Sequence, residues 1–236
     1  VAWLKFDEKE GTTAYDSSGT GNYAYLSSAA TNLPVWTRGK FGSGLEFDDS
    51  VANEEYAVAY DDYRLRPSKG LSVMAWFKHT GSSDGWDCLV TGDMDIGTWT
   101  WSLGLSGTGY GFFMMNPNDA DDTDRYYLYT PDEYDDADDA GIWRHLAGTY
   151  DGEYMRIYVD GILENSYATT TPIHSASSSI VVGASSVGGG SSLDGVIDDV
   201  RIYNYTRTQK QILEDMNAGR PALESPWIHY DFNKGY

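Results

Sequence analysis

Short runs of alternating apolar and polar residues, separated by turn residues, constrain the fold of this chain more than any other feature. The clearest case is residues 148–167, where the dipeptides Asp151-Gly152 and Asp160-Gly161 enclose one such run. Both dipeptides favour two-residue hairpin turns, because Asp and Gly tolerate a positive φ. The enclosed residues alternate, with three apolar side chains on one face: Met155, Ile157 and Val159. The segment predicts a three-stranded antiparallel meander.

Similar runs extend the β pattern over most of the remaining chain. We expect further strands at 2–6, 44–48, 55–60, 71–79, 99–105, 109–115, 125–129 and 180–184. The composition agrees, because 19 Tyr, 8 Trp and 7 Phe favour strands, while 26 Gly supply turns. The sequence therefore predicts an all-β sandwich of about a dozen strands.

One helix is predicted near the C-terminal end of the chain. Thr208 and Gln211 have the spacing of a capping box, and Gly219 is suited to end the helix. The predicted buried stripe of this helix is apolar: Ile212, Leu213 and Met216.

The charge of the chain excludes several classes of partner. With 36 acidic and 16 basic side chains, the net charge of −20 repels nucleic acid and anionic lipid. No run approaches the ~18 apolar residues of a membrane span, and we find no signal peptide in the sequence. The sequence begins at Val1 rather than Met, so we expect a mature or excised fragment. The single cysteine, Cys88, permits no intrachain disulfide and is expected to be a small core residue.

The strongest local charge lies in residues 116–142, which hold nine Asp and one Glu against one Arg. Two interpretations stay open: a pair of solvated loops around the strand at 125–129, or a second cation site. The segment does not match an EF-hand, because Ala147 stands where the bidentate Glu belongs.

Asp198 interrupts an otherwise apolar face of a predicted strand. Val196, Val200 and Ile202 share its parity and are expected to point into the core. A buried carboxylate needs a partner, and the options are a cation, backbone N–H groups or a metal. The neighbouring Asp199 has the opposite parity and is expected to be a surface charge.

The two ends of the chain carry similar nonapeptides. WLKFDEKEG (3–11) aligns without gaps with WIHYDFNKG (227–235), and the two share Trp, Asp and Gly. We therefore expect one domain over residues 1–218, a linker at 219–226, and the start of a following similar domain at 227–236.

Five motifs follow one another within residues 3–218. They are KFDEKEGTTAYDSSGTGN (5–22), KFGSGLEFDD (40–49), GLSVMAWFK (70–78), WRHLAGTYDGEYMRIYVDG (143–161) and LDGVIDDVRIYNYTRTQKQI (193–212). Their order resembles that of bacterial laminin-G-like, concanavalin A-like lectin/glucanase domains, which are often attached to carbohydrate-active and adhesive proteins. The resemblance implies an all-β, two-sheet antiparallel jelly-roll sandwich with one short C-terminal helix.

The resemblance also implies a structural Ca²⁺ where the N-terminal segment meets the last strand. The matching positions are Asp7, Asp16, Asn22 and Asp198, which offer the oxygen ligands that Ca²⁺ prefers. The alternative is that Asp198 accepts hydrogen bonds from backbone N–H groups of the N-terminal loop, without a metal.

Patterns typical of catalysis are incomplete. Glycanases of the same fold carry two catalytic carboxylates in an E-x-D-x-E strand, and neither LEFDD (45–49) nor GDMDIG (92–97) has the third acid. The four histidines show no H-x-x-x-H spacing, and His145 is expected to be structural. We therefore expect no enzymatic activity.

Aromatic side chains outside the expected core are the candidates for sugar binding. Trp86 stands in a loop rich in Gly, Ser and Asp, while Tyr127 and Tyr129 share one face of a strand. Tyr134 follows in the acidic segment. Trp99 is a further candidate, and its alternative is core packing.

These features together predict a non-catalytic carbohydrate-binding module of a secreted or cell-surface multidomain protein, stabilised by structural calcium. Its expected partner is a polysaccharide or glycan, with no nucleic acid or membrane, and the isolated domain is expected to be monomeric. The alternative is an adhesion or spacer domain that binds a protein or nothing. A glycoside hydrolase of the same fold is the third possibility.

Overall fold

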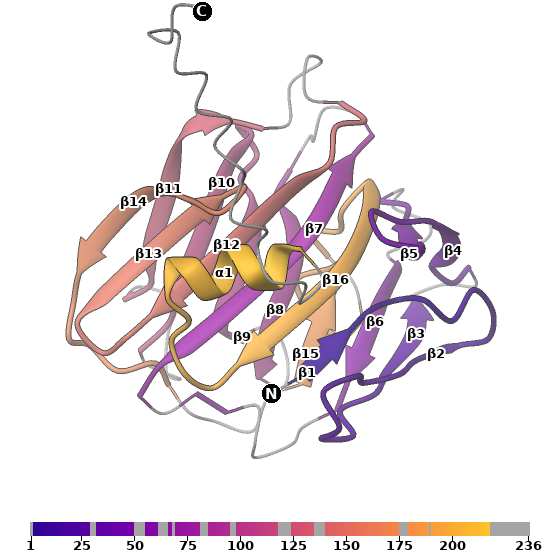
Figure 1. The fold of residues 1–236 in the computed structure, drawn as a ribbon, viewed down its shortest axis with the longest axis horizontal. Helices are drawn as coiled ribbons and strands as arrows, with labels where there is room; N and C mark the ends of the chain where they lie inside the picture. Colours follow the sequence, from indigo (N-terminus) through magenta and orange to yellow (C-terminus); the bar gives the residue numbers. More distant parts are fainter. Residues whose placement is uncertain are drawn as a thin grey trace, which may run out of the picture.

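The computed structural model describes residues 2–28, 32–49, 55–60, 66–67, 69–80, 85–94, 98–117, 124–134, 140–174, 179–188 and 190–217. These residues form two antiparallel sheets packed face to face, with one short helix on the outside (Figure 1). The predicted all-β jelly-roll sandwich is therefore confirmed.

Sheet A carries the helix. Its strands are β1 (Ala2–Leu4), β4 (Val35–Arg38), β5 (Ser43–Phe47), β7 (Leu71–His79), β12 (Arg144–Tyr150), β13 (Tyr154–Val159), β14 (Ile162–Ala168) and β16 (Gly195–Tyr203). The strand order is β14-β13-β12-β7-β16-β5-β4, and β1 also pairs with β16. Along one edge of β16, β5 pairs with its first part and β1 pairs with its last part. The strand that pairs with this edge therefore changes around Asp198.

Sheet B forms the other layer. Its strands are β2 (Thr13–Ala14), β3 (Ala24–Ser28), β6 (Glu55–Ala59), β8 (Asp87–Met94), β9 (Thr98–Leu105), β10 (Tyr110–Met115), β11 (Tyr126–Glu133) and β15 (Ser179–Val182). The strand order is β11-β10-β9-β8-β15-β6-β3-β2, so β11 and β2 are the two edges.

The core lies between the two sheets, because alternate residues of each strand point inward. Its largest fully buried members come from both layers: Trp101, Phe6, Phe47, Phe77 and Phe113. The predicted meander is confirmed as β12-β13-β14, and Met155, Ile157 and Val159 are core residues. At the second turn, Asp160 and Gly161 have φ of 49° and 77°, as the hairpin prediction requires.

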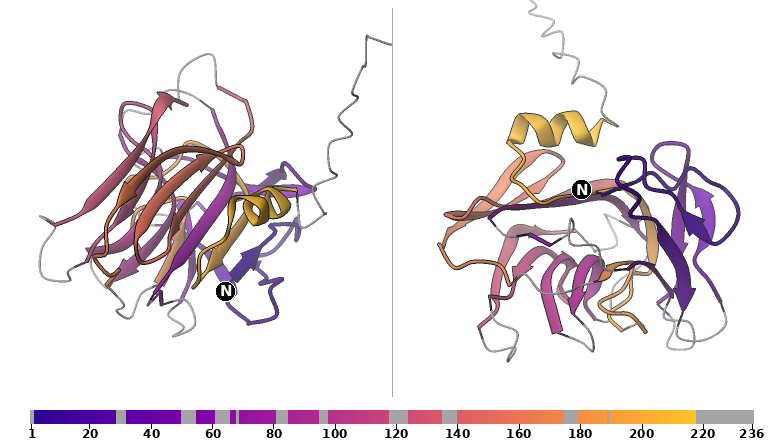
Figure 2. Two further views of the ribbon diagram at one scale, coloured as in Figure 1. Left: turned by 60° about the vertical axis from the view of Figure 1, so that its left-hand side comes forward. Right: turned by 90° about the horizontal axis from the view of Figure 1, so that it is seen from below.

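The helix, α1 (Gln209–Met216), lies across the outer face of sheet A (Figure 2). The predicted capping box is confirmed, because Thr208 and Gln211 exchange side-chain to backbone hydrogen bonds. The predicted buried stripe is partly wrong. Ile212 and Asp215 are buried, whereas Leu213 and Met216 are only half-buried.

Asp215 is buried because it meets two arginines under the helix. Its Oδ1 accepts hydrogen bonds from Arg201 at 2.9 Å and from Arg207 at 2.7 Å. Asp199 joins this network through Arg201, with N–O distances of 3.2–3.4 Å, and accepts a hydrogen bond from the Trp3 indole N–H. The prediction that Asp199 is a surface charge is therefore wrong, and its exposed fraction is 4%.

The reason lies in the backbone of β16. Its register against β7 shifts between Asp198 and Arg201, and Asp199 adopts a φ of 49°. Such a bulge breaks the simple alternation of faces. Both aspartates are buried and border the same small cavity. The prediction that Asp198 points into the core with Val196 is wrong, because Ile197 between them is the core residue.

Several predictions fall outside the described residues. The linker at 219–226, the second domain start at 227–236 and the helix stop at Gly219 all do so. The acidic segment 116–142 is described only in part, so its second cation site stays a prediction. Within the described residues, no helix is long and apolar enough to cross a membrane.

Candidate functional site

Three of the five predicted sugar-binding aromatics form one cluster. The ring centroid of Trp86 lies 5.5 Å from that of Tyr127 and 6.5 Å from that of Tyr129. The two tyrosine rings stack almost parallel, 5.9 Å apart with an interplanar angle of 8°. Trp86, which precedes Tyr127 by 41 positions in the sequence, thus joins the two tyrosines in one aromatic surface.

Strand parity places this cluster on the outer face of sheet B. Leu128 points into the core, so its neighbours Tyr127 and Tyr129 on β11 point outward. They stand opposite Met114 and Phe112 of β10, respectively. Trp86 packs edge-on against the Phe112 ring at 4.9 Å, which anchors it although it precedes β8.

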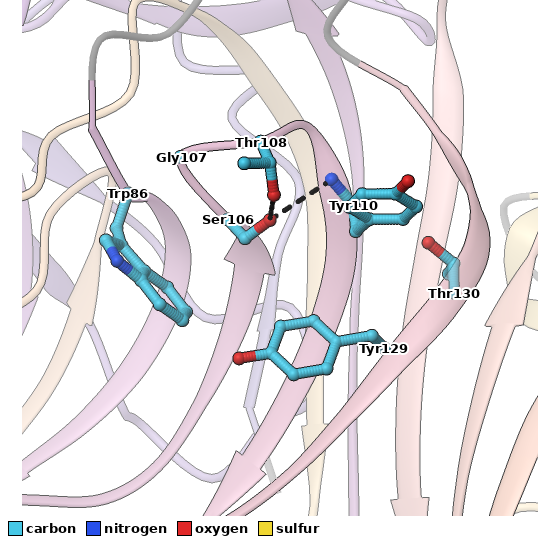
Figure 3. Close-up of a pocket in the computed structure, with 7 residues that line it drawn as sticks. All are labelled: Trp86, Ser106, Gly107, Thr108, Tyr110, Tyr129 and Thr130. Carbon is cyan, nitrogen blue, oxygen red and sulfur yellow. Dashed lines mark hydrogen bonds between the residues drawn. The ribbon is translucent and has the colours of Figure 1, made fainter.

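A pocket of about 610 Å³ opens beside this cluster. It is lined by Trp86, Ser106, Gly107, Thr108, Tyr110, Tyr129 and Thr130. Figure 3 shows the Trp86 and Tyr129 rings extending toward the same space, next to the turn that carries Ser106 and Thr108. We call the pocket and its cluster the pocket site.

Hydroxyl groups supply the polar lining of the pocket site. The Ser106 hydroxyl accepts the Tyr110 backbone N–H at 3.2 Å and lies 3.2 Å from the Thr108 hydroxyl. The Thr130 hydroxyl donates to the Asp132 carbonyl at 2.8 Å. Burial raises the pKa of Tyr129, so its hydroxyl is a neutral donor at physiological pH. Aromatic faces beside neutral hydroxyls suit a polyhydroxylated, uncharged ligand.

The sequence did not identify five of these lining residues, Ser106, Gly107, Thr108, Tyr110 and Thr130. Ser106, Gly107 and Thr108 belong to the turn between β9 and β10, and Tyr110 begins β10 directly after it. These residues line the pocket only because the turn folds beside Trp86, and no local sequence pattern indicates that this turn and Trp86 lie together.

The other two predicted aromatics lie outside the pocket lining. Trp99 is half-buried against the outer cluster of Cys88, Phe112 and Met114, and the Arg125 guanidinium lies 4.4 Å from its ring centroid. Its predicted alternative, packing in the core between the sheets, applies instead to Trp101.

Tyr134 packs against the main core rather than the aromatic cluster. Its ring lies 5.6 Å from the Arg144 guanidinium, and burial raises its pKa to about 12. The structure therefore does not bring Tyr134 to the pocket site.

The predicted calcium ligands separate into two places. Asp16 and Asn22 lie in one loop, where the Asp16 carboxylate accepts five hydrogen bonds. The donors are the backbone N–H groups of Trp3, Ser18 and Asn22 and the hydroxyls of Ser18 and Thr20. These bonds outweigh burial and hold the pKa of Asp16 near 2, so this carboxylate is stabilised by the loop itself.

Asp198 is fully buried at the point where β16 changes partners. Its Oδ2 accepts the backbone N–H of Phe41 at 2.8 Å, and its Oδ1 accepts that of Asp199 at 2.7 Å. Two backbone N–H groups thus partner this carboxylate, although they come from the segment around 40 and from β16 itself, not from the N-terminal loop. Burial raises the pKa of Asp198 to about 7, and the Asp199 and Asp7 carboxylates add to that rise.

A cavity of about 60 Å³ lies beside Asp198. Its lining is Trp3, Lys5, Asp7, Phe41, Asp198 and Asp199. Three carboxylates border this cavity, yet within the described residues no three His, Cys, Asp or Glu side chains are grouped closely enough to hold a metal ion. The predicted four-residue calcium set stays a prediction, and two of its members, Asp7 and Asp198, line this cavity.

His145, expected to be structural, is buried on sheet A. Its ring packs edge-on against Trp76 at 5.3 Å, and burial lowers its pKa to about 3. A histidine that stays neutral throughout the physiological range cannot exchange a proton there, which agrees with a packing role.

Comparisons with solved structures find the same fold in an arabinanase domain and in the binding domains of toxins. The chain is similar to domain 4 of AbnA, a GH43 extracellular arabinanase from Geobacillus stearothermophilus, whose structure is a complex with arabinotriose. The TM-score is 0.70 and the identity 19%, over 91% of this chain and 96% of that chain.

It is also similar to botulinum neurotoxin type C in a structure on its interaction with two ganglioside molecules, with a TM-score of 0.65 and 15% identity. The binding domain of Paraclostridial Mosquitocidal Protein 1 gives a TM-score of 0.69 and 15% identity. These two cover 93% and 92% of this chain, which spans about half of each, 51% and 52%. At such identities the likeness shows the fold alone.

No curated protein sequence matches the chain. The family model described as the concanavalin A-like lectin/glucanases superfamily matches residues 49–213, which is more than half of the sequence. With the two-sheet jelly roll and the order of motifs along it, this match shows that the chain belongs to the concanavalin A-like lectin/glucanases superfamily.

Proposed function

We propose that this chain is a non-catalytic carbohydrate-binding module of an extracellular multidomain protein. The observation that carries the proposal is the pocket site, where the Trp86, Tyr127 and Tyr129 rings gather beside a pocket lined with neutral hydroxyls. Sugar rings present flat C–H surfaces that pack on aromatic faces, and their hydroxyls exchange hydrogen bonds with Ser, Thr and Tyr side chains.

Charge narrows the class of glycan. The chain carries a net charge of −20, which opposes a polyanionic ligand at ordinary ionic strength. None of the described residues that line the pocket carries a charged side chain. A neutral polysaccharide is therefore the ligand that we propose.

The relatives support the ligand class. Domain 4 of AbnA, which has the same fold, was solved in complex with arabinotriose. Cell entry of botulinum neurotoxin type C depends on interaction with two ganglioside molecules, and this chain matches 51% of that chain. The arabinanase is an extracellular enzyme, which supports the proposed setting. Identities of 19% and 15% leave the choice of sugar to experiment.

The lining also argues against glycoside hydrolysis at this site. Hydrolysis by this class of enzyme requires two carboxyl groups on either side of the bond. Among the residues that the structure describes, the seven that line the pocket carry none. Incubation with each bound polysaccharide should release no reducing ends, and release that depends on Trp86 would contradict the proposal.

The test is a binding assay on the chain as it stands. A panel of neutral polysaccharides that includes arabinan, with polygalacturonate as the anionic comparison, is screened by affinity electrophoresis. We expect retardation by at least one neutral polymer. The change Trp86→Ala should weaken it by about 1–3 kcal/mol, up to about 150-fold in Kd, by analogy with base stacking.

The matched control is Tyr154→Ala, which removes an exposed aromatic from β13 of sheet A. It should leave retardation unchanged. If no neutral polymer retards the wild-type chain, the adhesion or spacer role replaces the proposed one. If Trp86→Ala retains full retardation with an unchanged melting temperature, the pocket site does not bind the glycan.

We also propose a structural Ca²⁺ between Asp7 and Asp198, a reduced form of the predicted set. The buried carboxylate of Asp198 and the exposed one of Asp7 border one small cavity, and a divalent cation would relieve their mutual repulsion. Binding to the native state alone would raise the melting temperature in proportion to the logarithm of the calcium concentration. A melting temperature that chelator leaves unchanged in metal-stripped buffer would contradict this site.

A further inference from the structure

Four tyrosines outside the pocket site are exposed together at the other end of sheet B. The exposed fractions are 57% for Tyr15, 42% for Tyr23, 46% for Tyr25 and 63% for Tyr60. Their rings pair, with centroids 5.4 Å apart for Tyr15 and Tyr23 and 6.0 Å apart for Tyr25 and Tyr60. We call these four residues the tyrosine patch.

The register of β2, β3 and β6 puts the whole patch on one face. Ala14 and Ala24 are paired and point into the core, so Tyr23 and Tyr25 on either side of Ala24 point outward. Tyr15 follows Ala14 and meets Tyr23 from the neighbouring chain segment. Tyr60 follows β6 and reaches the Tyr25 ring.

The tyrosine patch faces the same side of the sandwich as the pocket site. A continuous row of cross-strand partners joins them across sheet B: Tyr25, Val58, Val181, Thr91, Ser102, Met114 and Tyr127. Neighbours in this row point to the same face, because residues directly opposite each other in a sheet do so. Figure 1 shows β2 and β3 at one side of the molecule and β10 and β11 at the other.

The row also sets the separation of the two surfaces. From Tyr25 to Tyr127 there are six strand intervals of about 4.8 Å, or about 29 Å along the sheet. The middle of the row is buried, with exposed fractions of 0–1% for Val58, Val181 and Ser102. The tyrosine patch is therefore a separate surface and not an extension of the pocket.

We propose that the tyrosine patch is a second carbohydrate-binding surface, which takes the same neutral polysaccharide chain as the pocket site. The proposal rests on the proposed function, and it adds a second attachment point on the same face. The two surfaces together make the module bivalent toward a long polymer and monovalent toward a short oligosaccharide.

The chemistry of the patch favours a sugar chain as its occupant. Each of its side chains offers an uncharged aromatic face and a hydroxyl, as in the cluster of the pocket site. Exposed apolar surface gathered in one patch often marks a binding site. The net charge of −20 opposes polyanions, which leaves a neutral polyhydroxylated polymer.

Bivalency has a measurable consequence. When one site has bound a polymer, the second binds a nearby part of the same chain at a high effective concentration, and affinity gains on the order of 10²–10⁴-fold are typical. We expect the polysaccharide that binds best to bind at least about tenfold more tightly, per binding segment, than its own hexasaccharide.

The experiment compares three variants with the wild-type chain. Tyr25→Ser with Tyr60→Ser removes half of the patch, Trp86→Ala removes the pocket anchor, and Tyr154→Ser with Tyr205→Ser removes two exposed tyrosines elsewhere. Affinity electrophoresis gives the Kd for the polymer, and calorimetry gives the Kd for the hexasaccharide. Melting temperatures report folding, and Tyr60→Ser alone serves if the double variant is destabilised, because Tyr60 lies outside β6.

The patch variant should lose at least about tenfold in polymer affinity. Its hexasaccharide binding at the pocket site should remain, while the control double variant should match the wild type in both assays. Unchanged polymer binding by a folded patch variant overturns the inference and leaves the proposed function intact. If the patch variant loses polymer binding while Trp86→Ala binds the polymer as the wild type does, the tyrosine patch is supported as a binding surface. The same result would mean that the pocket site does not bind the polymer. A wild-type chain that binds no polymer overturns both.

Discussion

The buried carboxylate of Asp198 should make the free energy of unfolding depend on pH, and this prediction can be tested without any ligand. Its pKa lies at about 7 in the folded chain, against an ordinary value of 3.8. The native state therefore holds this proton more tightly than the unfolded state does. The stabilisation is fully present below pH 3.8 and is lost as the pH rises through about 7.

The size of the effect follows from the shift in pKa. One pKa unit corresponds to about 1.4 kcal/mol, so the complete titration is worth about 4 kcal/mol. Between about pH 5 and about pH 8 the contribution to the free energy of unfolding falls by roughly 2–3 kcal/mol. This is a large fraction of the ~5–15 kcal/mol that stabilises an ordinary domain.

The perturbation is Asp198→Asn, which keeps the size of the side chain and removes its proton equilibrium. Its single carbonyl oxygen can accept only one of the N–H groups of Phe41 and Asp199, so the variant loses a constant part of its stability. The informative quantity is the pH-dependent part. Urea unfolding at several values between about pH 5 and about pH 8, in chelator, gives the difference between wild type and variant at each pH.

We expect the advantage of the wild type over the variant to shrink by roughly 2–3 kcal/mol across that range. Subtracting the variant removes the contributions of the histidines and of other carboxylates. A difference that stays constant with pH would refute the argument that burial dominates over the two N–H bonds. Repeating the series with millimolar Ca²⁺ tests the metal proposal, because a bound cation keeps Asp198 ionised and flattens the slope.

Three further variants test the fold, each by urea unfolding. Thr208→Ala removes the cap of α1 and should lower the free energy of unfolding by about 1 kcal/mol, and no change would place the cap in the frayed part of the helix. Arg201→Met leaves Asp199 buried without its cation and should cost about 3–5 kcal/mol, whereas a loss below about 1 kcal/mol would mean that the ion network contributes little. Gly148→Ala would bring a Cβ to 2.5 Å from the Phe113 ring and should cost about 1–3 kcal/mol, unless the ring moves aside without loss.

Much of the architecture could be predicted because it is coded locally. The dipeptide Asp160-Gly161 permits the positive φ values of a tight turn, and Thr208 with Gln211 satisfies the helix start whatever lies nearby. The alternation of Met155 and Ile157 identifies the buried face of β13 for the same reason. These signals act over a few residues, so the chain carries them before any sheet exists.

The grouping of Trp86 with Tyr127 and Tyr129 was only half determined in this way. Parity on β11 indicated that the two tyrosines share a face, and the loop composition indicated that Trp86 stands outside the core. That these rings meet depends on the pairing of β10 with β11 and on Phe112 anchoring the indole. Parity orients a side chain within its strand, but it does not decide which distant strand becomes the neighbour.

Asp198 and Asp199 show what only the tertiary structure decided. Alternation in the sequence assigned Asp198 to the core face, whereas in the structure its neighbour Ile197 belongs to the core and Asp198 points to the other face of sheet A, opposite Trp76. The sequence by itself did not contain the exchange of β5 for β1 along β16, the bulge at that exchange, or the Arg201 and Trp3 side chains that meet Asp199 there. Side chains alternate between the two faces only while a strand keeps one register, and a bulge ends that alternation. The burial of Asp199 therefore depends on contacts between segments almost 200 residues apart in the sequence.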